Sequence, residues 1–328
     1  MNSRRIAVLF AIMVVLSILV GACQPQPAAV ETVVVTQEVV TEREVIVTQE
    51  VVVTQEVVVT PEPQAEETTL QRVQREGVVR VGFANENPYA FAQPDGTLSG
   101  EAVEVARAVF TALGVNEMEG VLTQFGSLIP GLQARRFDVI TAGMFINPTR
   151  CEQVLFADPE YKIGEGLIVE AGNPFDLHSY EDVAANPDVT IGTGAGYLEF
   201  EYLLSVGVPE DQIVTYPDDP SGVAGLQAGQ IDAWTATTPT LLKVLETTGD
   251  PNLEMADPFT DPVIDGQPVT GYGAAAFRPG DEDFRDAFNA ELQNLKDSGE
   301  LVEIISQFEG FGPQNDPGDA TAEQLCQP

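Results

Sequence analysis

From about Leu70 onward, short apolar segments alternate with amphipathic ones, and this alternation limits the folds that are open to the chain. Residues 78–84 and 138–144 read as short strands. Between them, the segment 101–113 has helical spacing, and one apolar face would be formed by Val103, Ala106, Val109 and Phe110. Strands that alternate with helices predict βαβ units and a parallel sheet, which is an α/β fold.

A second region of the same kind is inserted into the first. Residues 161–169 are expected to form one long strand that leaves the first lobe, and residues 272–277 a strand that returns to it. Two crossing strands make a natural hinge. We therefore predict two lobes, with lobe 1 at residues 70–168 and 274–328 and lobe 2 at residues 169–273.

The N-terminus has the features of an export signal. Two arginines precede an apolar run at residues 6–20, and small residues then lead to Cys23. This pattern resembles a bacterial lipobox, so we expect a lipoprotein signal peptide at residues 1–22 and a diacylglyceryl lipid on Cys23. The alternative is a single membrane-anchor helix, for which the apolar run is short, because a span needs about 20 residues.

Residues 23–69 contain a repeat of six residues. The sequence of Val33–Glu38 recurs at Val51–Glu56, and variants of it lie between and after these copies. The segment lacks glycine and aromatic residues, and we interpret it as a stalk between the lipid and the folded domain. The alternative is a strand that pairs with a partner, because runs rich in valine favour β-structure.

The charge and the cysteines are those of an exported protein. A net charge of -36 argues against binding to nucleic acid or to anionic membranes. If Cys23 carries lipid, an even pair remains, and in an oxidising compartment Cys151 and Cys326 would form one disulfide. The alternative is two free thiols.

Catalysis and cofactor binding have little support in the sequence. His178 is the only histidine, so no spacing typical of a metal site is present. No candidate nucleophile has a plausible base. We expect no metal, no cofactor and no catalytic residue, and therefore a protein that is not an enzyme.

Three aromatic residues follow or end predicted strands, and two charged residues accompany them. Tyr89, Phe125 and Phe145 are the aromatic residues, and Glu86 and Arg150 are the charged ones. In open α/β sheets, ligands bind at the carboxyl ends of the strands. Rings attract a cation through their faces, and a guanidinium binds a carboxylate with two N–H groups. The set therefore predicts a site for a small zwitterion with a delocalised cation.

Each of these residues also has an ordinary structural interpretation. Glu86 could be a solvated loop carboxylate, and any one of the rings could be a core residue. Arg150 could form a surface ion pair with an acid such as Glu152. The shared position of the residues at strand ends favours the ligand site.

Several segments are typical of one family: Ser127–Gln133, Phe137–Met144, Pro148–Arg150, Gly229–Ala233 and Ser298–Leu301. In these, the chain resembles the bacterial family 3 solute-binding proteins, which are extracytoplasmic receptors of polar amino-acid ABC importers. The resemblance implies a two-lobed periplasmic-binding-protein fold of type II, the Venus-flytrap fold, which closes around its ligand. It also implies a monomer that works with a cognate ABC permease and is held to the membrane only through its lipid.

Within this family, the pattern is most similar to that of ectoine and hydroxyectoine receptors. The similarity rests on Ala84–Tyr89, Phe145–Cys151, Asn186–Asp188 and Leu325–Cys326. It implies that Glu86 meets the ring nitrogens of the ligand, that the three aromatic residues form a box, and that Arg150 holds the carboxylate. The paired cysteines belong to the same pattern.

The chain also departs from the family in lobe 2. The glycine-rich turn Thr193–Tyr197 is expected to contact the ligand, but Tyr197 and Leu198 stand where the relatives carry a threonine that helps to hold the carboxylate. Amino-acid receptors place an acid shortly after the position of Asp232, and residues 236–238 of this chain offer none. Trp234 is either a pocket wall or a packing residue.

We therefore predict a receptor for ectoine, hydroxyectoine or a similar compatible solute. A receptor for polar amino acids is the main alternative. A periplasmic dehydratase or lyase that uses Glu86, or the sensor domain of a signalling receptor, would be a different class of protein.

Overall fold

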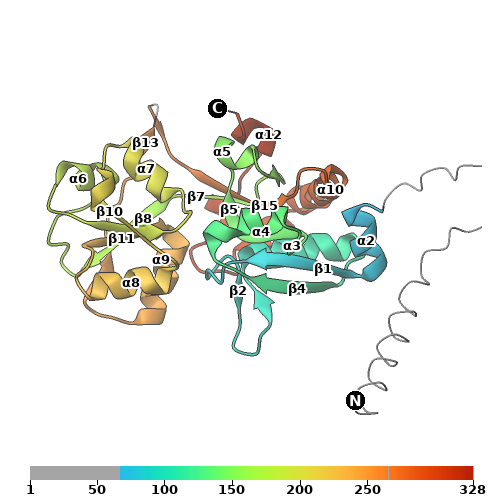
Figure 1. Cartoon of the computed structure of the whole chain (residues 1–328), viewed down its shortest axis with the longest axis horizontal. Helices are drawn as coiled ribbons and strands as arrows, with labels where there is room; N and C mark the ends of the chain where they lie inside the picture. Colours follow the sequence, from blue (N-terminus) through green and yellow to red (C-terminus); the bar gives the residue numbers. More distant parts are fainter. Residues whose placement is uncertain (1–66, 265, 328) are drawn as a thin grey trace, which may run out of the picture. The chain divides into compact units, whose positions relative to one another are not determined.

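The computed structural model describes residues 67–264 and 266–327 (Figure 1). The predicted signal peptide, the lipid-bearing Cys23 and the stalk up to residue 66 lie outside the described residues. The first described helix, α2 (Thr69–Glu76), begins with a capping box at Thr68 and ends at Gly77. Thr69 is buried, and its hydroxyl donates to Asp281 at 2.6 Å. The folded domain thus includes residues assigned above to the stalk.

Lobe 1 is built on a six-stranded sheet of order β4-β1-β5-β15-β6, with β7 also paired to β15. Its strands are β1 (Val78–Phe83), β4 (Glu117–Leu122), β5 (Val139–Phe145), β6 (Leu155–Phe156), β7 (Tyr161–Ile163) and β15 (Gly271–Phe277). The strands β4, β1 and β5 are parallel to one another, as the βαβ pattern predicts, whereas β15 runs antiparallel to its neighbours.

The helices of lobe 1 bury their apolar faces against this sheet or against one another. Besides α2, they are α3 (Glu101–Ala112), α4 (Leu128–Gln133), α5 (Pro148–Cys151), α10 (Glu282–Ser298), α11 (Glu300–Ile305) and α12 (Ala322–Leu325). Phe110 of α3 contacts Phe284 and Phe288 of α10, and these rings also meet Phe277 of β15. Burial of such rings contributes a large share of the hydrophobic stabilisation. A short hairpin, β2 (Phe91–Ala92) and β3 (Leu98–Ser99), precedes α3.

Lobe 2, on the left of Figure 1, has a five-stranded sheet of order β10-β9-β11-β8-β12. Its strands are β8 (Glu165–Glu170), β9 (Ile191–Gly194), β10 (Ile213–Tyr216), β11 (Ala233–Thr237) and β12 (Leu253–Met255), followed by the hairpin β13 (Val263–Ile264) and β14 (Gln267–Pro268). Its helices are α6 (Tyr180–Ala185), α7 (Glu199–Ser205), α8 (Asp219–Gln227) and α9 (Thr238–Thr248). One short 3-10 turn of lobe 2 lies at Glu210–Gln212, and two of lobe 1 lie at Phe125–Ser127 and Pro313–Asn315.

The hinge differs from the predicted one. The expected strand 161–169 is broken at Gly164, because β7 belongs to the sheet of lobe 1 and β8 to that of lobe 2. A Cβ atom on Gly164 would lie 2.7 Å from the carboxylate of Asp261, which accepts a hydrogen bond from the amide of Glu165 at 2.7 Å. The second crossing lies before Gly271, where β15 begins. Taken by the sheets to which its strands belong, lobe 2 spans about residues 165–270, a few residues from the predicted 169–273.

No helix in the described part of the chain is both long enough and apolar enough to cross a membrane.

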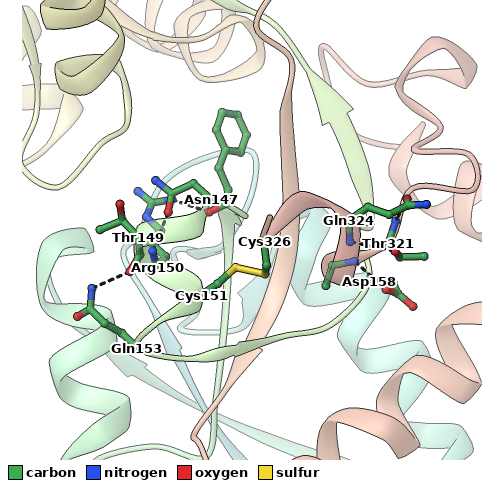
Figure 2. Close-up of a disulfide and its surroundings, with 11 residues drawn as sticks. Asn147, Thr149, Arg150, Cys151, Gln153, Asp158, Thr321, Gln324 and Cys326 are labelled. Atoms are coloured by element: carbon green, nitrogen blue, oxygen red, sulfur yellow. Dashed lines mark hydrogen bonds between the residues drawn. A yellow bond between two sulfur atoms is a disulfide. The ribbon is translucent and has the colours of Figure 1, made fainter. Parts of the chain in front are cut away.

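A disulfide joins Cys151 of α5 to Cys326, the residue that follows α12 (Figure 2). The two cysteines are 175 residues apart in the sequence. The bond ties the C-terminal segment to the short helix that carries Arg150, and the N-terminus of the same helix is capped by Asn147. The disulfide therefore restrains the segment from which the predicted carboxylate-binding residue arises.

We predict that the double variant C151S/C326S lowers the free energy of unfolding, by up to about 5 kcal/mol in the chain-entropy model, because the closed loop is long. Denaturant unfolding of the variant and of the wild type, with and without reductant, measures this difference. Reduced wild type should match the variant. An unchanged free energy of unfolding in both would contradict a structural role for the bond.

Two carboxyl groups are buried together in lobe 1. Glu101, at the start of α3, is fully buried, and neither of its oxygens has a hydrogen-bond partner among the described residues. Glu160 lies beside it and accepts a hydrogen bond from the amide of Ala275 at 3.2 Å. Burial raises the pKa of Glu160 from 4.5 to about 8 and also raises that of Glu101, whose shift is increased by the nearby charge of Glu160.

The raised pKa of Glu160 predicts how the stability of the folded protein depends on pH. Between about pH 4.5 and 8, the folded state keeps a proton on Glu160 that the unfolded chain has lost, so this group makes the protein less stable as the pH rises. We expect Glu160→Gln to flatten the fall of the melting temperature across that range, relative to wild type. Glu117→Gln, at an exposed position of β4, is the matched control. Equal slopes in all three proteins would contradict the prediction.

Candidate ligand-binding site

The residues after the strand ends of the two lobes meet around one cavity. Its lining residues are Glu86, Tyr89, Phe125, Gly143, Phe145, Arg150, Tyr197, Leu198, Glu199 and Thr237. The free space is about 30 Å³, far below the ~300–1,000 Å³ of typical small-molecule sites. The lobes therefore lie in a closed arrangement, and a solute can enter only if they move apart.

The sheets explain why residues far apart in sequence meet here. Glu86 and Tyr89 follow β1, Phe125 follows β4, and Phe145 is the last residue of β5. Because these three strands are parallel, their carboxyl ends lie at the same edge of the sheet of lobe 1. In lobe 2, the parallel strands β9 and β11 present Tyr197 and Thr237 in the same way.

Tyr89 and Phe145 form an aromatic wall that is packed from behind. The ring of Tyr89 stacks on Tyr161, with centroids 5.3 Å apart. It also lies against Gly143, where a Cβ atom would be 2.5 Å from the ring, so glycine is needed at that position. The ring of Phe145 covers Gly271 in the same manner, because a Cβ atom on that glycine would overlap the ring. Both rings are thus fixed in position before any ligand binds.

Phe125 makes contacts within the protein in addition to the role that the sequence predicts for it. The guanidinium carbon of Arg150 lies 5.5 Å from the centre of the Phe125 ring, and the ring of Tyr197 approaches it edge-on, with centroids 5.1 Å apart. One cation–π contact of Phe125 is therefore made with the protein's own arginine. Phe125 lines the cavity and also supports Arg150.

Arg150 is buried, with 8% of its surface exposed, and its partners are carbonyl groups. Its Nη1 donates to the carbonyl of Phe145 at 2.8 Å, and its Nη2 donates across to Gly196 of lobe 2 at 2.9 Å. It forms no ion pair within the described part of the chain, which includes Glu152. Burial lowers its pKa, but a guanidinium remains charged. Three of its five N–H groups remain for an anion.

Glu86 is held by a chain of hydroxyl groups that crosses between the lobes. The hydroxyl of Tyr89 donates to Thr237 at 2.8 Å, Thr237 donates to Thr240 at 3.1 Å, and Thr240 donates to the Glu86 carboxylate at 2.9 Å. Tyr89 and Glu86 belong to lobe 1 and the two threonines to lobe 2. Burial, together with the charge of Asp219, raises the pKa of Glu86 well above its ordinary value.

The turn after β9 brings Tyr197 to the cavity. The ring of Tyr197 lies over Gly194, and its hydroxyl donates to Asp219 of α8 at 3.1 Å. Thr193, in contrast, is fully buried within β9 and does not line the cavity. The predicted contact of this turn with the ligand therefore falls to Tyr197 and its neighbour Leu198.

Trp234 is also not a wall of the cavity. Its indole is fully buried in the core of lobe 2, where it meets the ring of Tyr216 and covers Gly192 and Gly222. Of the two interpretations of Trp234 that the sequence left open, the structure supports packing.

Sequence reasoning missed three side chains of the cavity, which are Leu198, Glu199 and Thr237. Thr237 lies in the segment where the resemblance to amino-acid receptors leads one to expect an acid. The absence of that acid could have pointed to Thr237 as a cavity residue. Glu199 follows the glycine-rich turn directly and begins α7. That position could have drawn attention to it, because a residue at a strand-to-helix turn faces the ligand edge of the sheet.

The described residues include no group of three or more His, Cys, Asp or Glu side chains that is suited to hold a metal ion. His178 lies at the surface of lobe 2, near Pro258 and Asp176 and away from the cavity.

Known proteins share this architecture. The family model of the bacterial extracellular solute-binding proteins, family 3, matches residues 79–311. A probable amino-acid ABC transporter periplasmic-binding protein of Sinorhizobium fredii is 37% identical over 262 residues, which cover 79% of this chain and 86% of that protein. The L-cystine-binding protein TcyJ of Escherichia coli is 26% identical over 75% of this chain and 88% of its own length.

Among solved structures, EhuB in complex with hydroxyectoine matches with a TM-score of 0.73 and 39% identity, over 80% of this chain and 98% of that one. An ancestral arginine-binding protein bound to arginine matches with a TM-score of 0.61 and 26% identity, over 71% and 99%. The two-lobed fold of this chain and the extent of these matches point to the same family. The chain belongs to the bacterial extracellular solute-binding proteins of family 3.

Proposed function

We propose that this protein is the receptor of an ABC importer and that it captures a small zwitterion with a delocalised cation, with ectoine or hydroxyectoine as the preferred ligands. The observation that carries the proposal is a buried guanidinium, the half-buried carboxyl of Glu86 and aromatic rings around one cavity. The 39% identity to EhuB, whose structure contains hydroxyectoine, supports the same ligand class.

In the proposed complex, each charged group of the ligand has its own partner. Arg150 binds the ligand carboxylate with N–H groups that its carbonyl partners leave free. Glu86 accepts an N–H from the cation, and Tyr89 and Phe145 offer ring faces to it. Because these groups are held by packing and by hydrogen bonds, little conformational entropy is lost when the ligand binds.

Closure of the lobes completes the site. The hydroxyl chain from Tyr89 to Glu86 and the bond from Arg150 to Gly196 form only when the lobes meet. A ligand that contacts both lobes stabilises the closed state relative to the open one, and the closed state is then the form that a permease recognises. Opening takes place at the crossings near Gly164 and before Gly271.

A receptor for polar amino acids is the second candidate, and relatives that bind cystine and arginine favour it. In this chain, however, Thr237 lines the cavity in the segment where amino-acid receptors carry an acid, and its hydroxyl is already bonded to Tyr89 and Thr240. A free α-ammonium would therefore depend on Glu86 or Glu199.

The place of the protein in the cell is part of the proposal. The export signal and Cys23 suggest a lipoprotein on the outer face of the cytoplasmic membrane, with residues 23–66 as a stalk. A monomer attached in this way would diffuse along the membrane to its permease.

Calorimetric titration of the full-length protein with ectoine, hydroxyectoine, glycine betaine and polar amino acids tests the function. We expect an ectoine to bind most tightly and to be recovered unchanged.

Arg150→Ala should weaken binding by about 2–5 kcal/mol, because a buried charge-assisted contact is lost, whereas Arg136→Ala, at an exposed position, should have no effect. Tight binding of amino acids alone, or a chemically altered ligand, would overturn the ligand assignment or the receptor class.

We predict that Thr240→Val weakens ligand binding by about tenfold or more and reduces the closed population, because it removes the donor to the Glu86 carboxylate. Small-angle scattering without ligand, together with calorimetry, measures both effects. Thr240→Ser should restore them, and Thr248→Val, at the exposed end of the same helix, is the control. Normal binding by Thr240→Val would show that the hydroxyl chain does not couple the lobes to the ligand.

A further inference from the structure

Glu199 adds a second acidic group to the cavity, opposite the one that the sequence predicts. It is the first residue of α7 in lobe 2, whereas Glu86 follows β1 of lobe 1. Both side chains line the cavity, and Glu199 is only 4% exposed. When the lobes close, the ligand is therefore enclosed between carboxyl groups from both sides, and Arg150 is the one basic residue of the lining.

A third carboxyl group stands behind Glu199. Glu165, the first residue of β8, is 3% exposed, and no N–H or hydroxyl group of the described residues donates to either of its oxygens. The carboxyl of Glu199 is its neighbour, and two neighbouring carboxyl groups can share a hydrogen bond only if one of them carries a proton.

The surroundings decide which carboxyl keeps the proton. Burial and the neighbouring charges raise the pKa of Glu165 well above 4.5, whereas the pKa of Glu199 rises only to about 7, because its own amide, Glu165 and Arg150 stabilise its charge. Of the two, Glu165 holds its proton more strongly and Glu199 takes up the negative charge more readily. The other charged or titratable groups that act on this pair are Glu86, Arg150, Asp219, Asp261, Tyr180, Tyr197 and Tyr202.

We infer that Glu199 is a second acidic contact for the cation of the ligand, positioned by Glu165, and that it makes the site select cations that carry N–H groups over quaternary ammonium solutes. The inference rests on the proposed function and narrows its ligand class. An amidinium presents N–H groups in two directions, so that one can bond Glu86 in lobe 1 and another Glu199 in lobe 2. Guanidinium and primary ammonium groups can do the same.

The reason for the selection is the cost of a buried acceptor without a donor. A carboxylate accepts hydrogen bonds, and a quaternary ammonium has no hydrogen to donate. Two carboxyl groups that lose water on closure and gain no donor from the ligand would penalise such a ligand, even where the aromatic rings attract its charge. Rejection of the quaternary cation therefore increases as the lobes close.

The test compares ectoine with glycine betaine in calorimetric titrations of the full-length protein. Glu199→Gln is expected to weaken ectoine binding by about tenfold or more and to reduce the preference for ectoine over glycine betaine. Glu199→Asp should give intermediate values. Glu181→Gln, which removes the same charge at an exposed position of lobe 2, should resemble wild type. Thermal unfolding confirms that each variant is folded.

Variants of Glu165 examine the positioning role separately. Glu165→Gln keeps a donor for Glu199 and is expected to bind ectoine like wild type, whereas Glu165→Met removes the donor and should weaken binding. In Glu165→Met, ectoine binding should also need a higher pH than in wild type, because Glu199 loses the hydrogen bond that favours its charged form. A merely structural role for Glu165 would leave the pH profile unchanged.

The outcomes separate the inference from the proposed function. If wild type binds ectoine and Glu199→Gln binds it equally well and with the same preference, the second contact is wrong and the receptor assignment remains. If wild type binds neither an ectoine nor any other N–H cation, both are wrong. If glycine betaine binds wild type as tightly as ectoine does, the selection rule is wrong.

Discussion

The burial of one guanidinium is the constraint on which the rest of this structure depends. Arg150 cannot lose its charge in the interior, so its surroundings must compensate for the loss of water. Asn147 caps its helix, the disulfide of Cys151 holds that helix to the C-terminal segment, and Phe125 supports the guanidinium from one side. These supports are neutral, and the bond to Gly196 ties the same group to lobe 2. Because none of these supports is an anion, the carboxylate that pairs with the guanidinium of Arg150 is left for the ligand to supply.

The acidic residues at the cavity, unlike Arg150, lie close to other groups of their own charge. Closure brings Glu86 of lobe 1 to Glu165 and Glu199 of lobe 2, and burial keeps protons on some of these groups. Their mutual repulsion is thereby reduced, and hydroxyl groups or a neighbouring carboxyl fix their orientation. A cation that enters this group of acids favours their charged forms, so ligand binding and proton release are linked. Lobe closure, ligand charge and protonation therefore belong to one equilibrium.

The two-lobed α/β fold was confirmed, and the grouping of the predicted ligand residues agrees with the rules of parallel sheets, while their roles in binding stay predictions. Tyr89, Phe125, Phe145 and Arg150 line one cavity, since residues at the carboxyl ends of adjacent parallel strands must meet. The differences between expectation and structure have equally local causes. Residues 161–169 look like one strand, but a side chain at Gly164 would strike Asp261, and the direction of the chain changes there. Thr193 and Trp234 lie in or beside the turn and strand that face the ligand, and nothing in the residue pattern reveals that both side chains point into the core.

The sequence by itself determined the α/β class, the two-lobed order and the group of residues that reaches the ligand edge, because these follow from hydrophobic periodicity and strand polarity. Only the tertiary structure decided how that group is completed. The contact of Phe125 with Arg150, the hydroxyl chain from Tyr89 to Glu86 and the pairing of Glu165 with Glu199 join residues from different strands or lobes. The hydroxyl chain depends on the closure of the two lobes, and the other two contacts depend on how separate elements pack within one lobe. Local sequence patterns carry no information about the distances between such elements.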